Sequence, residues 1–78
     1  MKKVVMYSTP TCHYCNLAKE FLDDHNISYE VFNVQSDLEK RKEMMEKSGQ
    51  MGVPVILVDN VLVKGFDEEE LKKLLEIE

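Results

Sequence analysis

The two cysteines of this 78-residue chain, Cys12 and Cys15, form a C-x-x-C pair. Residues three positions apart in a helix lie on one face, so these thiols can form a disulfide with little movement of the backbone. In a reducing compartment such a pair is more often catalytic or metal-binding than structural. The spacing therefore predicts reversible dithiol chemistry or ligation of a metal.

The residues around the pair predict that the two thiols differ. A short β-branched run over residues 3–7 reads as a strand, residues 8–11 are breakers, and an amphipathic pattern predicts a helix over residues 13–24. Cys12 then lies at a helix N-terminus, whose N–H groups stabilise a thiolate and lower the pKa of Cys12 below the usual value near 8.5. We expect Cys12 to attack first and Cys15, pointing toward the core, to attack second.

A metal site would need further ligands, and the chain has only His13 and His25 to add to the cysteines. Structural zinc takes four ligands. His13 would point away from a site shared by both thiols, and His25, expected to cap the helix C-terminus, lies more than two turns away. Zinc within one chain is therefore disfavoured. Two chains sharing zinc or an iron–sulfur cluster through Cys12 stay open as an alternative.

The two residues inside the pair admit two interpretations each. An imidazolium at His13 would favour the Cys12 thiolate, but the helix N-terminus disfavours a cation, so a solvated side chain is equally expected. Tyr14 can pack on a docked peptide or belong to the buried helix face. That predicted apolar face consists of Tyr14, Leu17, Ala18, Phe21 and Leu22.

The remaining patterns predict the elements that position the pair. Further strands are expected over residues 27–34, 53–58 and 61–63. Two more helices should begin at the capping boxes Ser36 with Glu39 and Asp67 with Glu70. The order β-α-β-α-β-β-α combines a parallel βαβ unit with an antiparallel hairpin. An α/β fold with one mixed four-stranded sheet flanked by three helices, in a single domain over residues 1–78, satisfies both.

Composition narrows the possible partners. Fifteen acidic residues against ten basic ones give a net charge of −5, which works against nucleic-acid binding. The run Lys40-Arg41-Lys42 lies among glutamates and is expected to be a solvated, salt-bridged helix face. The longest apolar run, residues 53–58, is too short to cross a membrane, and residues 2–9 do not read as a signal peptide. We expect a cytoplasmic protein.

Proline at position 54 begins a buried strand, where a missing N–H is costly unless it serves a purpose. A cis Val53–Pro54 bond would make a tight turn and leave the N–H and carbonyl of Val53 free to pair with an extended peptide or glutathione.

Taken together, these motifs resemble a small glutaredoxin over essentially the whole chain. The resemblance rests on residues 8–15, Gly52-Val53-Pro54 and Gly65-Phe66-Asp67. It implies the thioredoxin fold, oxidoreductase activity, Cys12 as nucleophile, Cys15 as resolving thiol and a cis Pro54 facing them. It further implies a monomer without a tightly bound cofactor that reduces disulfide-containing proteins in electron transport and redox homeostasis. The implied substrate-binding residues are Thr11, His13, Tyr14, Val53, Pro54, Gly65, Phe66 and Asp67.

Three departures from the resemblance concern the electron donor. Glutaredoxins usually have lysine where this chain has Thr9, threonine where it has Gly52, and a G-G-x-D loop where it has residues 64–67. Lys64 offers a replacement cation for a glutathione carboxylate. The Gly65-Phe66 dipeptide instead resembles redoxins that reduce ribonucleotide reductase and draw on thioredoxin reductase, and glutaredoxin-like proteins found near rubredoxin-type carriers are also similar. Glutathione and thioredoxin reductase both remain possible donors.

Overall fold

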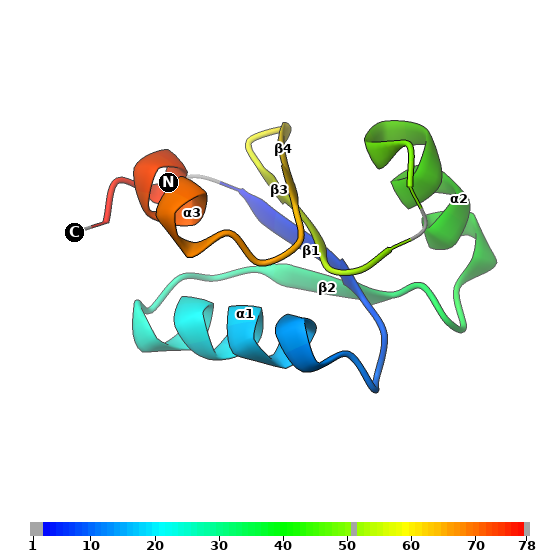
Figure 1. Ribbon diagram of the computed structural model, residues 1–78, viewed down its shortest axis with the longest axis horizontal. Coiled ribbons are helices and arrows are strands. Elements are labelled where there is room, and N and C mark those ends of the chain that lie inside the picture. The colour runs from blue at the N-terminus through cyan, green and yellow to red at the C-terminus, as the bar shows by residue number, and fades with distance from the viewer. Residues whose placement is uncertain (1–2, 51, 78) are drawn as a thin grey trace.

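The computed structural model describes residues 3–50 and 52–77. Its elements are β1 (Val4–Ser8), α1 (His13–Asp24), β2 (Glu30–Asn33), α2 (Leu38–Ser48), β3 (Val55–Val58), β4 (Val61–Lys64) and α3 (Glu68–Leu75). The four strands form a sheet in the order β2-β1-β3-β4 (Figure 1). This architecture confirms the predicted mixed sheet flanked by three helices.

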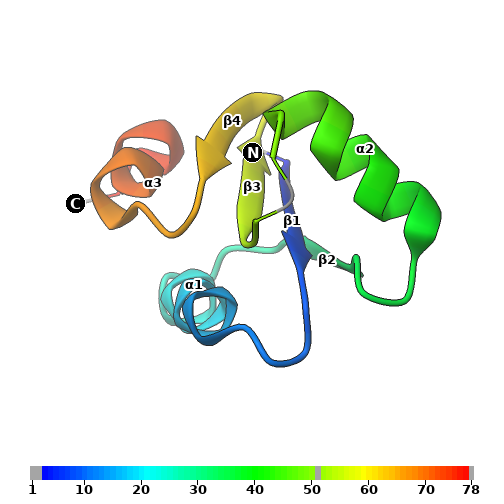
Figure 2. The ribbon, with the colours of Figure 1, turned by 45° about the vertical axis from the view of Figure 1, so that its right-hand side comes forward.

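The sheet joins a parallel half to an antiparallel half. Strand β1 pairs in parallel with β2, up to Ser8 opposite Asn33, and antiparallel with β3, where Tyr7 lies opposite Val55. Strands β3 and β4 form an antiparallel hairpin. Helices α1 and α3 cover one face of the sheet and α2 covers the other (Figure 2). The connection from β1 to α1, which carries Cys12, therefore leaves the sheet beside the end of β2.

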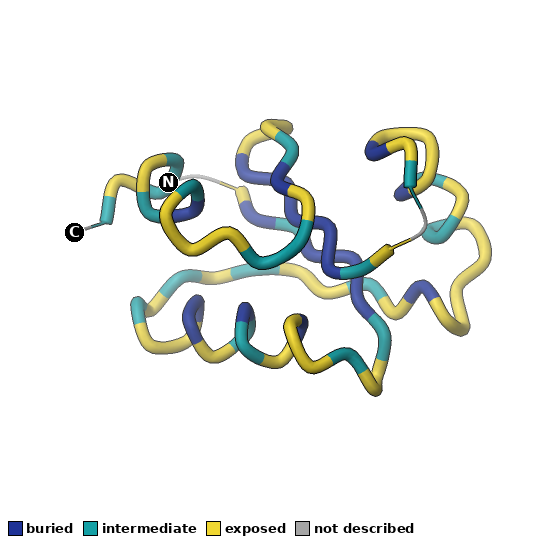
Figure 3. The backbone as a smooth tube through the Cα atoms, viewed as in Figure 1, coloured by how far each residue is buried: buried dark blue, intermediate teal, exposed yellow. Residues whose placement is uncertain are grey.

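Side chains of β1 alternate between two hydrophobic clusters, as the period of a strand requires. Met6 packs toward α1 and α3 in one cluster, while Tyr7 packs beneath α2 in the other. All four residues of β3 are buried, as predicted from its continuous apolar run (Figure 3). Strand β1 is thus packed on both faces directly before the connection that carries Cys12.

Among the described residues, every helix is too short or too polar to traverse a bilayer.

Two strands start at least two residues later than predicted, and β4 extends one residue beyond its predicted end, to Lys64. Strand β2 starts at Glu30 rather than at residue 27, because the Ile27 N–H donates to the Leu22 carbonyl at 2.9 Å and so belongs to the end of α1. Strand β3 starts at Val55 rather than at residue 53, because Val53 and Pro54 form a turn ahead of the ladder.

The N-terminus of α2 corrects the predicted capping box at Ser36. The N-cap is Asp37, whose carboxylate accepts the Lys40 N–H at 3.1 Å. The Ser36 hydroxyl instead lies 3.5 Å from the Asn33 carbonyl. The reason is the turn that ends β2: the Asn33 side chain accepts the Gln35 N–H at 3.0 Å, and this turn includes Ser36. At α3 the predicted cap Asp67 is confirmed, because its carboxylate accepts the Glu70 N–H.

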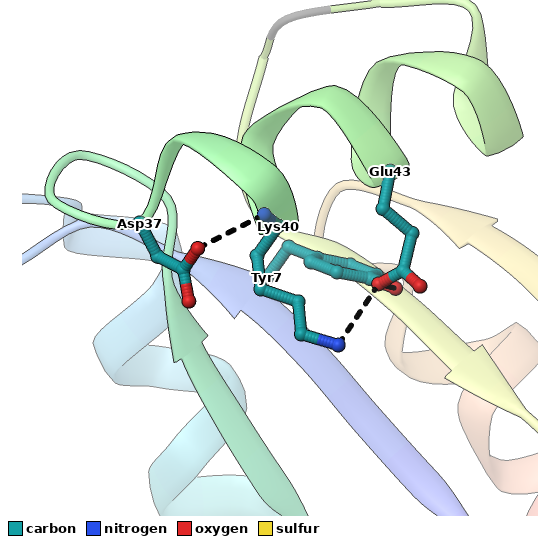
Figure 4. Close-up of polar contacts among 4 residues, drawn as sticks. All are labelled: Tyr7, Asp37, Lys40 and Glu43. Atoms are coloured by element: carbon teal, nitrogen blue, oxygen red, sulfur yellow. Dashed lines mark hydrogen bonds and ion pairs between the residues drawn. The ribbon is translucent and has the colours of Figure 1, made fainter.

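A buried tyrosine connects β1 to α2. The Tyr7 side chain is 1% exposed, and its hydroxyl donates to the Glu43 carboxylate at 2.7 Å (Figure 4). Lys40 contacts the same carboxylate at 3.4 Å and lies 4.2 Å from the centre of the Phe32 ring. Burial, together with the neighbouring carboxylate, raises the pKa of Tyr7. The Tyr7 hydrogen bond is the main cause that lowers the pKa of Glu43.

Replacing the observed cap should destabilise the fold, whereas replacing the predicted one should not. We expect Asp37→Ala to lower the free energy of unfolding by about 0.5 to 2 kcal/mol, because it leaves N–H groups of α2 without their acceptor. The matched control Ser36→Ala should stay within about 0.5 kcal/mol of the parent. Urea denaturation followed by circular dichroism measures both. A larger loss of unfolding free energy in Ser36→Ala than in Asp37→Ala would show that Ser36 is the cap.

The Tyr7 phenol should make stability depend on alkaline pH. Its pKa is raised in the folded chain, whereas an unfolded tyrosine ionises near pH 10. Above about pH 10 the unfolded chain releases a proton that the folded chain retains, so the stability is complete below that pH and is lost as pH rises. Tyr7→Phe should therefore show a shallower alkaline loss of stability in urea titrations.

A second phenol provides the control for this measurement. Tyr14→Phe removes the phenol of an exposed ring and serves as the control. Equal slopes for the parent and Tyr7→Phe would contradict the role given to the buried phenol.

Candidate functional site

Cys12 is the N-cap of α1. Its backbone is extended, with φ −85° and ψ 114°, and its Sγ accepts the Cys15 N–H at 3.1 Å. The Cys12 N–H donates to the Thr9 carbonyl at 3.3 Å, and this closes the turn after β1. The sulfur thus occupies the place that a serine or aspartate oxygen takes in an ordinary cap. A thiolate at this place receives an N–H hydrogen bond together with the positive end of the helix.

Cys15 lies one turn into the helix and has no exposed surface, whereas Cys12 is partly exposed. The two are paired as a disulfide, with their Cα atoms 5.1 Å apart. Cys15 belongs to the cluster between the sheet and α1, as predicted, and Cys12 packs against the edge of that cluster. Solvent or a partner molecule therefore reaches Cys12 before Cys15.

The Val53–Pro54 bond is cis, as the family resemblance implied. Pro54 is buried, and its carbonyl accepts the Gly65 N–H at 2.8 Å. Gly65 has φ +76°, a conformation that glycine adopts readily. In the hydrogen bonds among residues 3–50 and 52–77, the N–H and carbonyl of Val53 have no partner. Pairing of these two groups with an added peptide strand stays a prediction.

Three segments converge on one cluster. Cys12, Val53 and Phe66 all pack as partly buried residues against the core between the sheet and α1. The Phe66 ring stands edge-on to Phe21, with 5.9 Å between ring centres. The start of α1, the turn before β3 and the turn before α3 therefore all border the same core. Their union in one substrate site, which the resemblance implied, stays a prediction. The contact of Gly65 with Pro54 was not predicted, and its only local signal is the glycine itself.

The prediction that Tyr14 belongs to the buried face of α1 is wrong. Its side chain is 59% exposed, whereas Cys15, Ala18, Phe21 and Leu22 are the buried residues of the helix. Tyr14 directly precedes the buried Cys15, and neighbouring residues of a helix do not face the same way. It lies edge-on to His13, with 5.4 Å between ring centres. Of the two interpretations of Tyr14, only packing on a docked peptide agrees with this exposure.

The other predicted residues have simpler surroundings. Thr11 and His13 are exposed, and within the described chain neither side chain makes a hydrogen bond. Asp67 is exposed and caps α3. His25 is the C-cap of α1 as expected, with its Nδ1 atom 2.9 Å from the Phe21 carbonyl oxygen. Residues 3–50 and 52–77 contain no group of three or more His, Cys, Asp or Glu side chains arranged to hold a metal ion.

Comparison with known proteins agrees with this geometry. Residues 4–63 match the glutaredoxin family model. A glutaredoxin-like protein of the rubredoxin operon of Clostridium pasteurianum is 44% identical over 73 residues, which cover 94% of this chain and 97% of that protein. Glutaredoxin 3 of Escherichia coli is 34% identical over 68 residues, covering 87% of this chain and 82% of the relative.

Solved structures share the whole fold. A thioredoxin-like protein, solved as a variant, superposes with a TM-score of 0.92 at 37% identity, and all of both chains is covered. A glutaredoxin from Archaeoglobus fulgidus gives a TM-score of 0.85 at 30% identity over 96% of this chain and 87% of the other. The chain therefore belongs to the glutaredoxin family and is a dithiol–disulfide oxidoreductase with the thioredoxin fold.

Proposed function

We propose that Cys12 is the nucleophile and Cys15 the resolving thiol in the reduction of protein disulfides. The observation that carries this order is the difference between the two sulfurs. Cys12 is partly exposed and caps α1 with an N–H directed at its Sγ, whereas Cys15 is fully buried one turn away. A nucleophile has to be reached by its substrate, while a resolving thiol needs only to reach the first sulfur.

The reaction then proceeds in two exchanges. The Cys12 thiolate attacks one sulfur of the substrate disulfide, and the other substrate sulfur leaves as a thiolate that takes up a proton. Cys15 loses its proton and attacks Cys12 in the resulting mixed disulfide. This attack releases the second substrate thiol and closes the Cys12–Cys15 disulfide. Two electrons have passed from the protein to the substrate.

Substrate binding is assigned to the residues around Cys12. We expect an extended segment of the substrate to pair with the N–H and carbonyl of Val53, which have no hydrogen-bond partner among the described residues. We assign the exposed Thr11, His13 and Tyr14 to the same substrate-binding surface. Gly65, Phe66 and Asp67 are assigned to it as well, because the hydrogen bond from Gly65 ties their turn to Pro54.

Cycling requires a source of electrons and a reducing compartment. We assign the protein, as a monomer, to the cytoplasm, where thiols are kept reduced. Glutathione or thioredoxin reductase returns the disulfide to two thiols, and the protein thereby acts as an electron carrier without a tightly bound cofactor. Lys64 supports the glutathione route, because it is exposed and immediately precedes the Gly65 turn.

Substitution of each cysteine tests the order of attack. Cys12→Ser should abolish reduction of a protein disulfide, because no nucleophile remains within reach. Cys15→Ser should retain the first exchange and accumulate a mixed disulfide on Cys12, visible as an adduct by intact mass spectrometry. An adduct on Cys15 in the Cys12→Ser variant, with none in Cys15→Ser, would reverse the assigned roles.

A lysine substitution tests the glutathione route. The oxidised protein is supplied with NADPH, glutathione and glutathione reductase, and the return of its thiols is followed over a range of glutathione concentrations. Lys64→Ala should raise the KM for glutathione several-fold by removing a cation near its carboxylates. Lys73→Ala, an exposed lysine of α3, serves as the control.

The outcomes of this assay separate the donors. An unchanged KM in Lys64→Ala would remove Lys64 from glutathione binding. Reduction by NADPH with thioredoxin reductase, but none by glutathione, would identify the reductase as the electron donor. The threonine at position 9, where glutaredoxins usually have lysine, would then account for the lack of reduction by glutathione.

A further inference from the structure

Helix α2 has a second face, directed away from the buried one, on which two apolar side chains lie among charged ones. Its inward face buries Met44 and Ser48. On the outward face lie five residues at helical spacing that line a shallow hollow of about 440 Å³, which we call the α2 stripe: Leu38, Arg41, Lys42, Met45 and Glu46. Leu38 is 69% exposed and Met45 is 40% exposed. A merely solvated helix face would carry polar residues at these two positions.

The charges of the α2 stripe favour an acidic partner. Within the described residues, the cations of α2 form one ion pair, between Lys40 and Glu43, and neither Arg41 nor Lys42 has an acidic partner. The expectation of a salt-bridged face over residues 40–42 is therefore met only at Lys40. Helix α2 carries four cations against three anions, although the whole chain has a net charge of −5.

The α2 stripe begins at the end of the sheet that carries the cysteines. The Val34 N–H donates to the Ser8 carbonyl at 2.9 Å, and the Asp37 N–H donates to the Asn33 carbonyl at 3.0 Å. The first turn of α2 is therefore tied to the last residue of β1, from which the chain passes through residues 9–11 to Cys12. Figures 1 and 2 both show the start of α2 and the connection from β1 to α1 at this end of the molecule.

We propose that the α2 stripe docks an acidic segment of the protein whose disulfide Cys12 attacks, with an apolar side chain of that segment held between Leu38 and Met45. Arg41 and Lys42 pair with the acidic side chains, which would raise the rate of encounter and orient the disulfide toward Cys12. Methionine adapts its shape to different apolar partners, which suits a surface that receives more than one sequence. The inference rests on the proposed function, because it extends the substrate surface of the same site.

Amide chemical shifts of the full reduced chain test the docking without relying on thiol chemistry. The probe is a cysteine-free peptide with one leucine flanked by glutamates, and the control peptide has lysines in place of the glutamates. We expect the glutamate peptide to shift amides within residues 38–46 and the shifts to weaken as salt is added. Shifts that are absent there, or equal for both peptides, would overturn the proposal. If the chain instead dimerises through α2 in the absence of peptide, the proposal is overturned, because the occupant of the α2 stripe is then a second copy of this chain.

Kinetics then connect the α2 stripe to turnover. The substrates are two disulfide-closed peptides with a glutamate arm or a lysine arm, and bis(2-hydroxyethyl) disulfide, which has no arm. Arg41→Glu with Lys42→Glu should lower kcat/KM for the glutamate arm by about tenfold, mainly through KM. Leu38→Ser should lower it as well, whereas Lys73→Glu on α3 and Val61→Thr, at another exposed apolar residue, should not.

The substrate without an arm keeps the two proposals distinct. A parent protein that reduces neither this substrate nor the lysine-arm peptide would contradict the proposed function, while the chemical shifts still decide the docking. If it is reduced normally and the glutamate arm keeps its full rate in the charge-reversed variant, the α2 stripe plays no part in docking.

Discussion

The hydrogen bond from the Cys15 N–H to the Cys12 Sγ is the contact around which this small site is organised. It requires Cys12 to be the last residue before the helix and Cys15 to lie one turn inside it. A sulfur held there meets a backbone donor and the positive end of α1, whatever substrate approaches. The rest of the fold has to keep the start of α1 still and leave one sulfur accessible. Both clusters contribute, because β1 places neighbouring side chains in each of them directly before the cysteine loop.

Local patterns were sufficient for most of the fold. The bounds of α1 followed from the breakers before Cys12 and from the apolar period after it, and they agree with the structure. The hairpin after β3 followed from Asp59 and Asn60, which both adopt positive φ. Failures occurred where two local signals compete. Ser36 and Asp37 are both good caps, and only the turn built on Asn33 decides between them.

The candidate site was less accessible from local patterns. The cis bond before Pro54 came from family resemblance, because local sequence alone gives cis a frequency of about 5 to 6%. Helical periodicity placed Tyr14 on the buried face, but its side chain is exposed, because the period does not show how far the core extends along the helix. The bond from Gly65 to Pro54 joins residues eleven positions apart, and capping rules describe only neighbours in the chain. The α2 stripe shows the converse: its charges were visible in the sequence, but that Arg41 and Lys42 have no acidic partner among the described residues was not.

The burial of Cys15 links catalysis to the folding equilibrium. Cys15 is a core residue whose sulfur alternates between a thiol and a disulfide in every catalytic cycle. Folding and reduction form a closed thermodynamic cycle. Any difference in stability between the dithiol and disulfide forms must therefore equal the change that folding makes to the free energy of reducing the pair. Substitutions among the side chains around Cys15 can thus change the free energy of reducing the pair without any contact with a substrate.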